Sequence, residues 1–115
     1  DNKTYKKNVY KQGKHITWNN KNIYYRSSYE LDYAMYLDNL KIDYDVEKIR
    51  IKYFDTVLNK ERIAIPDFYL IDSNTLVEIK SKYTLDEINM LNKKEAYLKN
   101  GYNFKLILDK KEVIF

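Results

Sequence analysis

The sequence predicts a mixed α/β (α+β) fold, in which helices flank a mixed central β-sheet in the order αβββαβ. Two segments carry a helix-start signal followed by helical spacing of apolar residues. Between and after them lie short runs rich in β-branched and aromatic residues, which are typical of strands. A chain of 115 residues has the length of one domain, so we expect a polar N-terminal arm over residues 1–14 and a single domain over residues 15–115.

The first structured elements are a predicted hairpin over residues 15–25 and a predicted helix from Ser27 to about Leu40. Asparagines fill most of the polar segment 19–22, and asparagine tolerates positive φ, which favours a turn there. Ser27 followed three residues later by Glu30 matches the capping box that begins many helices. The sequence therefore predicts that the helix starts at Ser27.

Three strand segments follow this helix. Ile42–Phe54 alternates between apolar and polar residues in stretches and predicts a strand, which a polar loop over Asp55–Glu61 ends. Arg62–Ile71 and Thr75–Lys80 are short β-branched and aromatic runs around a turn, and together they predict a β-hairpin.

The second helix is predicted from Thr84 to about Asn100. Thr84 and Glu87 repeat the capping-box spacing, and Gly101 suits the position just after a helix end. Short strands are then expected at Phe104–Leu108 and at Val113–Phe115. The apolar residues that give the helix its periodicity lie along one side: Leu85, Ile88, Leu91 and Leu98.

Composition narrows the chemistry that the chain can carry. It has no cysteine and one histidine, His15, which excludes disulfides, thiolate zinc sites and multi-histidine metal sites. Any metal must be held mainly by oxygen ligands, which suit Mg²⁺ or Mn²⁺. The net charge of +4 is compatible with a polyanionic partner such as DNA. No apolar run suggests a membrane span or a secretory signal, so we expect a cytoplasmic protein with no membrane partner.

The predicted hairpin brings two acids together. If Asp72 and Ser73 form its turn, Leu70 faces Thr75, and the same register places Asp67 opposite Glu78. Like charges on directly opposed residues destabilise a strand pair, and the apolar neighbours indicate that this pair is partly buried. Folding does not require such an arrangement, and a bound divalent cation would relieve the repulsion.

Glu78 and Lys80 are two residues apart on a strand, so their side chains share one face. The backbone carbonyl of Ile79 can add an oxygen ligand. Two carboxylates, a carbonyl and a lysine on one face suit hydrolysis of a phosphodiester, with the lysine as base or charge stabiliser. Taken singly, E-x-K is usually a salt-bridged surface and Pro-Asp often a turn. The combination favours a site, because Pro66 is predicted mid-strand and the spacing is that of a tight hairpin.

Three short motifs resemble those of one enzyme superfamily. Ile65-Pro66-Asp67-Phe68 and Val77-Glu78-Ile79-Lys80 resemble the PD-(D/E)xK motif of restriction-endonuclease-like nucleases. Tyr25-Arg26-Ser27-Ser28-Tyr29-Glu30 resembles the first-helix motif of small phage endonucleases and transposon-end nucleases in that superfamily. The resemblance covers residues 23–108.

The resemblance implies a restriction-endonuclease-like core and a Mg²⁺- or Mn²⁺-dependent DNA endonuclease, phage-encoded and acting in the host cell. It implies that Glu30, Asp67, Glu78 and Lys80 are catalytic. It also implies that Glu30 joins Asp67, Glu78 and the Ile79 carbonyl at the metal, although the capping box alone explains Glu30.

The same resemblance suggests residues that contact nucleic acid. Arg26 and Ser28 either contact a phosphate, or Arg26 pairs with an acid. Lys93 and Lys94 on the second helix either approach the site or the DNA backbone, or belong to a solvated flank. Two alternatives stay open: an inactive nuclease-fold module that binds nucleic acid, and a junction-resolving nuclease that acts as a homodimer. Because no DNA-reading motif accompanies the core, specificity is expected from a separate domain or protein.

Overall fold

The computed structural model describes residues 12–115, and the chain divides into two compact units, Asp1–Asp43 and Tyr44–Phe115. The structure is mixed α+β with a mixed central sheet and two helices among the described residues, so the predicted mixed class is confirmed, whereas the order αβββαβ stays a prediction. Most of the predicted N-terminal arm lies outside the described residues, and Gly13 already belongs to a strand. Neither helix in the described part is long and apolar enough to cross a membrane.

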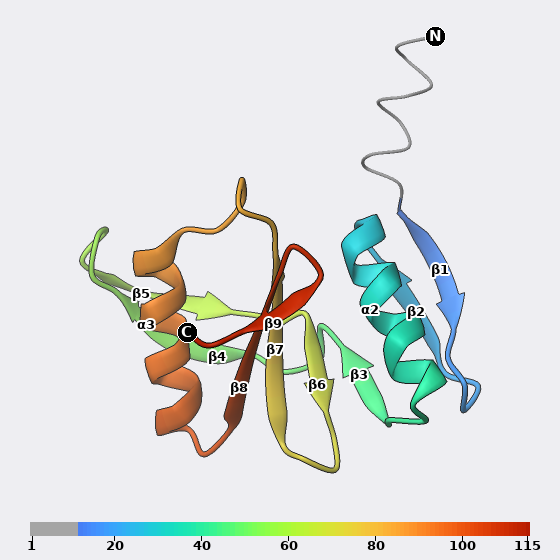
Figure 1. The fold of residues 1–115 in the computed structure, drawn as a ribbon. Helices are drawn as coiled ribbons and strands as arrows, with labels where there is room; N and C mark the ends of the chain where they lie inside the picture. The colour runs from blue at the N-terminus through green and yellow to red at the C-terminus, as the bar shows by residue number, and fades with distance from the viewer. Residues whose placement is uncertain (1–11) are drawn as a thin grey trace, which may run out of the picture. The chain divides into compact units, whose positions relative to one another are not determined.

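The first unit is a β-hairpin followed by a helix (Figure 1). The hairpin turns where the asparagine-rich segment predicts: Asn20 has a φ of 65°, and the Thr17 N–H donates to the Lys21 carbonyl at 2.8 Å. The elements of this unit are β1 (Gly13–Ile16), β2 (Asn22–Tyr25) and α2 (Ser28–Asn39).

Helix α2 begins as the capping box predicts, with one change. Ser27 is the N-cap, and its Oγ accepts a hydrogen bond from the Glu30 N–H at 3.3 Å. The return bond goes one residue further back than in the standard motif, because Glu30 Oε1 accepts from the Arg26 N–H at 3.1 Å. The helix ends before Lys41, whose φ of 58° reverses the chain.

The second unit contains a five-stranded mixed sheet, a separate two-stranded ribbon and helix α3 (Figure 1). The sheet order is β3-β6-β7-β8-β9, in which β7 and β8 run parallel and the other neighbours run antiparallel. Helix α3 forms the crossover between the two parallel strands and packs on β4 and β8. The elements are β3 (Tyr44–Val46), β4 (Ile51–Asp55), β5 (Lys60–Ala64), β6 (Phe68–Leu70), β7 (Thr75–Lys80), α3 (Glu87–Lys99), β8 (Asn103–Leu108) and β9 (Lys111–Val113).

Two of the predicted strands are each broken in two. The strand predicted over Ile42–Phe54 is interrupted after β3 at Glu47, whose φ of 51° takes the chain out of the sheet and into the β4–β5 ribbon. The strand predicted over Arg62–Ile71 is interrupted around Pro66, which has no N–H to give to a ladder. The prediction that Pro66 lies mid-strand was therefore wrong: it lies where the chain passes from the ribbon back into the sheet.

The predicted register of the central hairpin is confirmed. Strands β6 and β7 pair with Leu70 opposite Thr75, around a turn in which the Asn74 N–H donates to the Ile71 carbonyl. The ladder ends at the pair formed by Phe68 and Val77. Extending its register by one residue leads to the two acids that the sequence singled out.

Helix α3 starts later than predicted and ends as predicted. Its N-cap is Asp86, whose side chain accepts from the Asn89 N–H at 3.0 Å. Thr84 does not cap the helix, because its hydroxyl accepts from the Ser81 N–H in the preceding turn. At the far end Gly101 has a φ of 89°, a conformation that glycine adopts without steric cost.

The face that α3 buries is not the side with the strongest apolar periodicity. Ile88, Leu91 and Leu98 are each about half exposed. Met90, Ala96 and Tyr97 are buried instead, and the last two join a core cluster with residues of β4, β5 and β7. That cluster consists of Ile51, Tyr53, Ala64, Leu76, Ala96 and Tyr97.

Candidate metal and active site

Asp67 lies at the break between the ribbon and strand β6, beside the end of the β6–β7 ladder. Its Oδ2 accepts a hydrogen bond from the Ile79 N–H at 2.7 Å. Because the ladder stops at Phe68, β6 offers no carbonyl to this N–H, and the Asp67 carboxylate takes that place. The side chain of Asp67 is thereby held against the middle of the E-x-K segment.

Glu78 lies on β7 and is a buried acid, with 2% of its surface exposed. Its Oε2 accepts a hydrogen bond from the hydroxyl of Tyr97 at 2.5 Å. Tyr97 comes from α3 and is fully buried, so the contact joins the helix to the sheet inside the core of the second unit.

Besides burial, the negative charges of Glu78 and Asp67 contribute to a raised pKa of Tyr97. Burial, followed by the negative charge of Glu78, its hydrogen bond and the charge of Asp67, raises the pKa of Tyr97 far above its ordinary range. Tyr97 therefore keeps its proton at neutral pH and acts as a hydrogen-bond donor to Glu78.

The Ile79 carbonyl points toward the edge of β7 where Asp67 lies. In a strand, the N–H and C=O of one residue face the same neighbour, and the Ile79 N–H faces Asp67. By extension of the β6–β7 register, Glu78 lies opposite Asp67, so the predicted donors come from one short stretch of this hairpin, and their role at a metal stays a prediction.

This donor set fits a magnesium-type cation. Mg²⁺ is commonly bound through one or two carboxylates, with water and substrate phosphate completing its shell. Between residues 12 and 115, no group of three or more His, Cys, Asp and Glu side chains is arranged to hold a metal ion. A cation here would therefore depend on Asp67, Glu78 and backbone or solvent oxygens.

Lys80 lies two residues after Glu78, near the end of β7, and its side chain is half-buried. Its backbone carbonyl accepts from the Asp109 N–H at 2.9 Å, which anchors the end of the strand. Within the described part of the chain, its ammonium makes no ion pair or side-chain hydrogen bond.

Glu30, Arg26 and Ser28 belong to the first unit. Glu30 takes part in the N-terminal cap of α2, and Ser28 is the first residue of that helix. Arg26 is exposed and uses its backbone N–H in the same cap. Their roles at a metal or at a phosphate stay predictions.

The two lysines of α3 have different surroundings. Lys93 Nζ lies 5.8 Å from the centre of the Tyr53 ring and lines a cavity of about 370 Å³ between α3 and the β4–β5 ribbon. Lys94 instead donates to the carbonyl of Phe115 and lies over its ring. Lys93 therefore lines a cavity, and Lys94 is bonded to Phe115.

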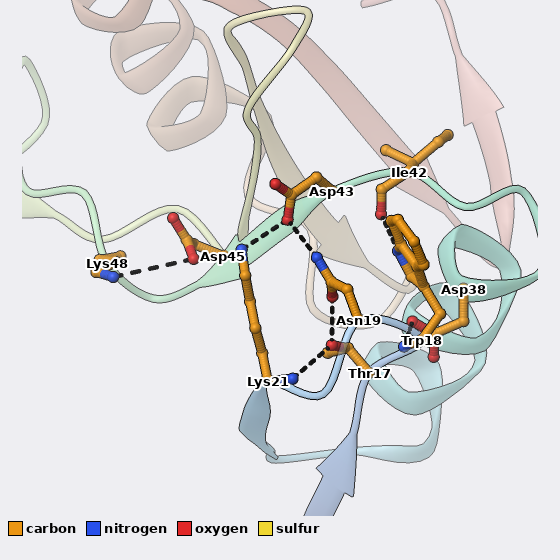
Figure 2. Close-up of polar contacts among 9 residues, drawn as sticks. All are labelled: Thr17, Trp18, Asn19, Lys21, Asp38, Ile42, Asp43, Asp45 and Lys48. Atoms are coloured by element: carbon orange, nitrogen blue, oxygen red, sulfur yellow. Dashed lines mark hydrogen bonds and ion pairs between the residues drawn. The ribbon is translucent and has the colours of Figure 1, made fainter.

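Other acids have structural partners. Figure 2 shows Asn19 and Lys21 of the first unit converging on Asp43, with Asn19 Nδ2 at 3.0 Å and Lys21 Nζ at 2.6 Å from Asp43 Oδ1. In the second unit, Asp45 forms a 3.9 Å ion pair with Lys48.

Tyr97 is the residue of this site that the sequence prediction missed. Its spacing from Met90, seven residues along the same helix, marks the buried face, but 13 tyrosines in the chain make any one of them inconspicuous. Comparisons of the chain with protein-family models, with curated proteins and with solved structures found no match.

Proposed function

We propose that this chain is a divalent-metal-dependent DNA endonuclease of the PD-(D/E)xK type. The observation that carries the proposal is the buried Glu78 carboxylate beside the carboxylate of Asp67, with Lys80 two residues further along the strand. A buried carboxylate is costly unless it is paired or coordinates a metal. Tyr97 supplies a hydrogen bond but no positive charge.

Metal binding and stabilisation of the reacting phosphate are assigned to different residues of the chain. Asp67 and Glu78 would hold the cation with the Ile79 carbonyl, and the role of Glu30 stays a prediction of the resemblance. A bound cation would polarise the phosphate and lower the pKa of water. Lys80 accepts a proton or stabilises the negative charge that develops on the phosphate.

The fold supports the same assignment. Strand β7 runs parallel to β8 across helix α3, and antiparallel to β6, so Glu78 and Lys80 lie on the central strand of the mixed sheet, and Asp67 lies just before the neighbouring strand β6. This is compatible with a restriction-endonuclease-like core, to which the hairpin β1–β2, the ribbon β4–β5 and strand β9 would be additions. The net charge of +4 is compatible with DNA as the substrate, and Lys93 is the preferred candidate for a backbone contact.

The test is nicking of supercoiled plasmid by the purified chain in Mg²⁺, in Mn²⁺ and in EDTA. We expect nicking with either metal and none in EDTA. To identify a junction-resolving nuclease, cleavage of a four-way DNA junction is compared with cleavage of a linear duplex of the same sequence. DNA binding without metal-dependent cleavage of any of these substrates would overturn the proposal in favour of an inactive binding module.

A further inference from the structure

The hydroxyl of Tyr97 has one partner and no evident packing purpose. The Tyr97 ring lies in the core cluster and packs against the ring of Phe104, with centroids 6.0 Å apart. A phenylalanine ring would fill that space equally well. The hydroxyl adds a 2.5 Å hydrogen bond to Glu78 Oε2, inside a core where polar groups are expensive.

This hydrogen bond determines which carboxylate oxygen of Glu78 is left without a protein partner among the described residues. Tyr97 is the hydrogen-bond partner of Glu78 within the described residues, and it binds Oε2. No fully buried side-chain oxygen in that part of the chain lacks a partner. It follows that Oε1, which has no such bond, reaches solvent although the residue as a whole is 2% exposed. One oxygen is hydrogen-bonded within the core, and the other keeps some solvent-accessible surface.

We propose that Tyr97 is a positioning residue, which holds Glu78 through Oε2 so that Oε1 is presented to a divalent cation. This inference rests on the proposed function, because it concerns the same cation. Tyr97 touches neither cation nor DNA and acts only through Glu78. Groups that orient a metal ligand in this way typically change metal affinity or activity by about 10- to 100-fold when they are removed.

The test is Tyr97→Phe, which keeps the ring and removes the hydroxyl. Calorimetry should show Mn²⁺ affinity lowered by about 10- to 100-fold. The Mg²⁺ concentration that half-saturates plasmid nicking should rise by a similar factor, with most of the maximal rate recovered at saturating metal. Tyr102→Phe is the matched control, since the Tyr102 hydroxyl makes no hydrogen bond within the described residues, and it should bind Mn²⁺ like wild type.

A double-mutant cycle separates positioning from general stability. In a Glu78→Ala background, Tyr97→Phe should change Mn²⁺ affinity no further, because the carboxylate through which it acts is absent. Circular dichroism in EDTA establishes that each variant is folded before metal is added. A purely structural tyrosine would lower the melting temperature but leave the Mn²⁺ affinity of the folded protein unchanged.

The outcomes separate the two proposals. If wild type binds Mn²⁺ and Glu78→Gln weakens that binding, but Tyr97→Phe binds like wild type, the positioning role is overturned and the metal site stands. If wild type binds no Mn²⁺, both the metal site and the role of Tyr97 are overturned.

Discussion

Two buried acids in the second unit have different surroundings. Asp55, at the end of strand β4, accepts from the N–H groups of Val57 and Leu58 at 2.9 Å and from Arg62 at 3.0 Å. A guanidinium and two backbone donors therefore satisfy its charge. Glu78 accepts from Tyr97, lies opposite Asp67 when the β6–β7 register is extended by one pair, and makes no ion pair within the described residues.

The contrast is between an acid whose charge the fold pairs and one that has only a neutral donor within the described residues. The fold compensates a buried charge by pairing it, or a bound cation does so. The charge of Asp55, near the tip of the ribbon, is paired with Arg62. In the described part of the chain, Glu78 has only a neutral donor, Tyr97, and its other carboxylate oxygen keeps some solvent-accessible surface, where a cation would bind in the proposed function.

The largest expected effect is an opposite response of the two acids to amide substitution. Glu78→Gln should reduce plasmid nicking to background and leave stability unchanged or higher, because glutamine keeps an oxygen for Tyr97 and removes the buried charge. Asp55→Asn should leave nicking intact and lower the melting temperature, because it removes the ion pair with Arg62. Urea melts in EDTA, run beside nicking assays, measure both responses. Destabilisation of Glu78→Gln by several kcal/mol would mean that Glu78 is as structural as Asp55.

Substitution of Lys80 tests whether the proposed site at Glu78 catalyses cleavage in addition to binding metal. Lys80→Ala should slow DNA turnover by about 10²- to 10⁴-fold, the usual contribution of a general acid or base. Its Mn²⁺ affinity in calorimetry should stay within a few-fold of wild type, because an ammonium does not ligate a cation. Lys82→Ala is the control for loss of one positive charge near the end of β7. A fully active Lys80→Ala protein would contradict the assigned mechanism.

Addition of Mn²⁺ should raise the free energy of unfolding through binding at Glu78 and Asp67, and Asp55 should take no part in this effect. At a free Mn²⁺ concentration of 100 times Kd, binding to the native state adds about 2.7 kcal/mol to the free energy of unfolding. Thermal melts in Mn²⁺ and in EDTA measure this difference. It should disappear in Asp67→Ala and persist in Asp55→Asn. Equal melting temperatures for wild type in both buffers would argue against a divalent site.

The smallest expected effect is the pH dependence that Asp55 contributes. Hydrogen bonds from the Leu58 N–H and from Arg62 hold the pKa of Asp55 below its ordinary value of 3.8. A depressed folded-state pKa gives stability that is present above 3.8 and is lost as pH falls from there through the folded pKa. The difference in melting temperature between wild type and Asp55→Asn should therefore be constant near neutral pH and shrink below about pH 4. A constant difference down to pH 2 would exclude this linkage.

Local signals predicted the parts of the site that lie close together in sequence. The turn residues and apolar alternation fixed the register of β6 and β7, which follows from spacing along a single hairpin. The ends of α2 and α3 that depend on Ser27 and Gly101 were also predictable, because a cap is a matter of a few neighbouring residues.

Features that depend on distant partners were not predictable. Apolar alternation changes phase at Glu47 and Lys48, which signals an irregularity, but nothing local showed that β3 and β4 join different sheets. The buried face of α3 depends on what the helix packs against, and Tyr97 meets Glu78 across 19 positions of sequence. The different surroundings of Lys93 and Lys94 likewise arise from Tyr53 and Phe115, far from them in the chain.

The parallel pairing of β7 and β8 has a consequence for the order in which this unit folds. The β6–β7 hairpin needs only a short turn, whereas Thr75 pairs with Asn103 only after the whole α3 crossover has closed. Closing a long loop costs entropy before any contact repays it, so pairings of this kind form slowly. The hairpin can therefore bring Asp67 and Glu78 together early, while Tyr97 reaches Glu78 only when α3 docks. A partly folded chain, in which α3 has not docked, would carry Glu78 opposite Asp67 without the Tyr97 hydroxyl that fixes its orientation.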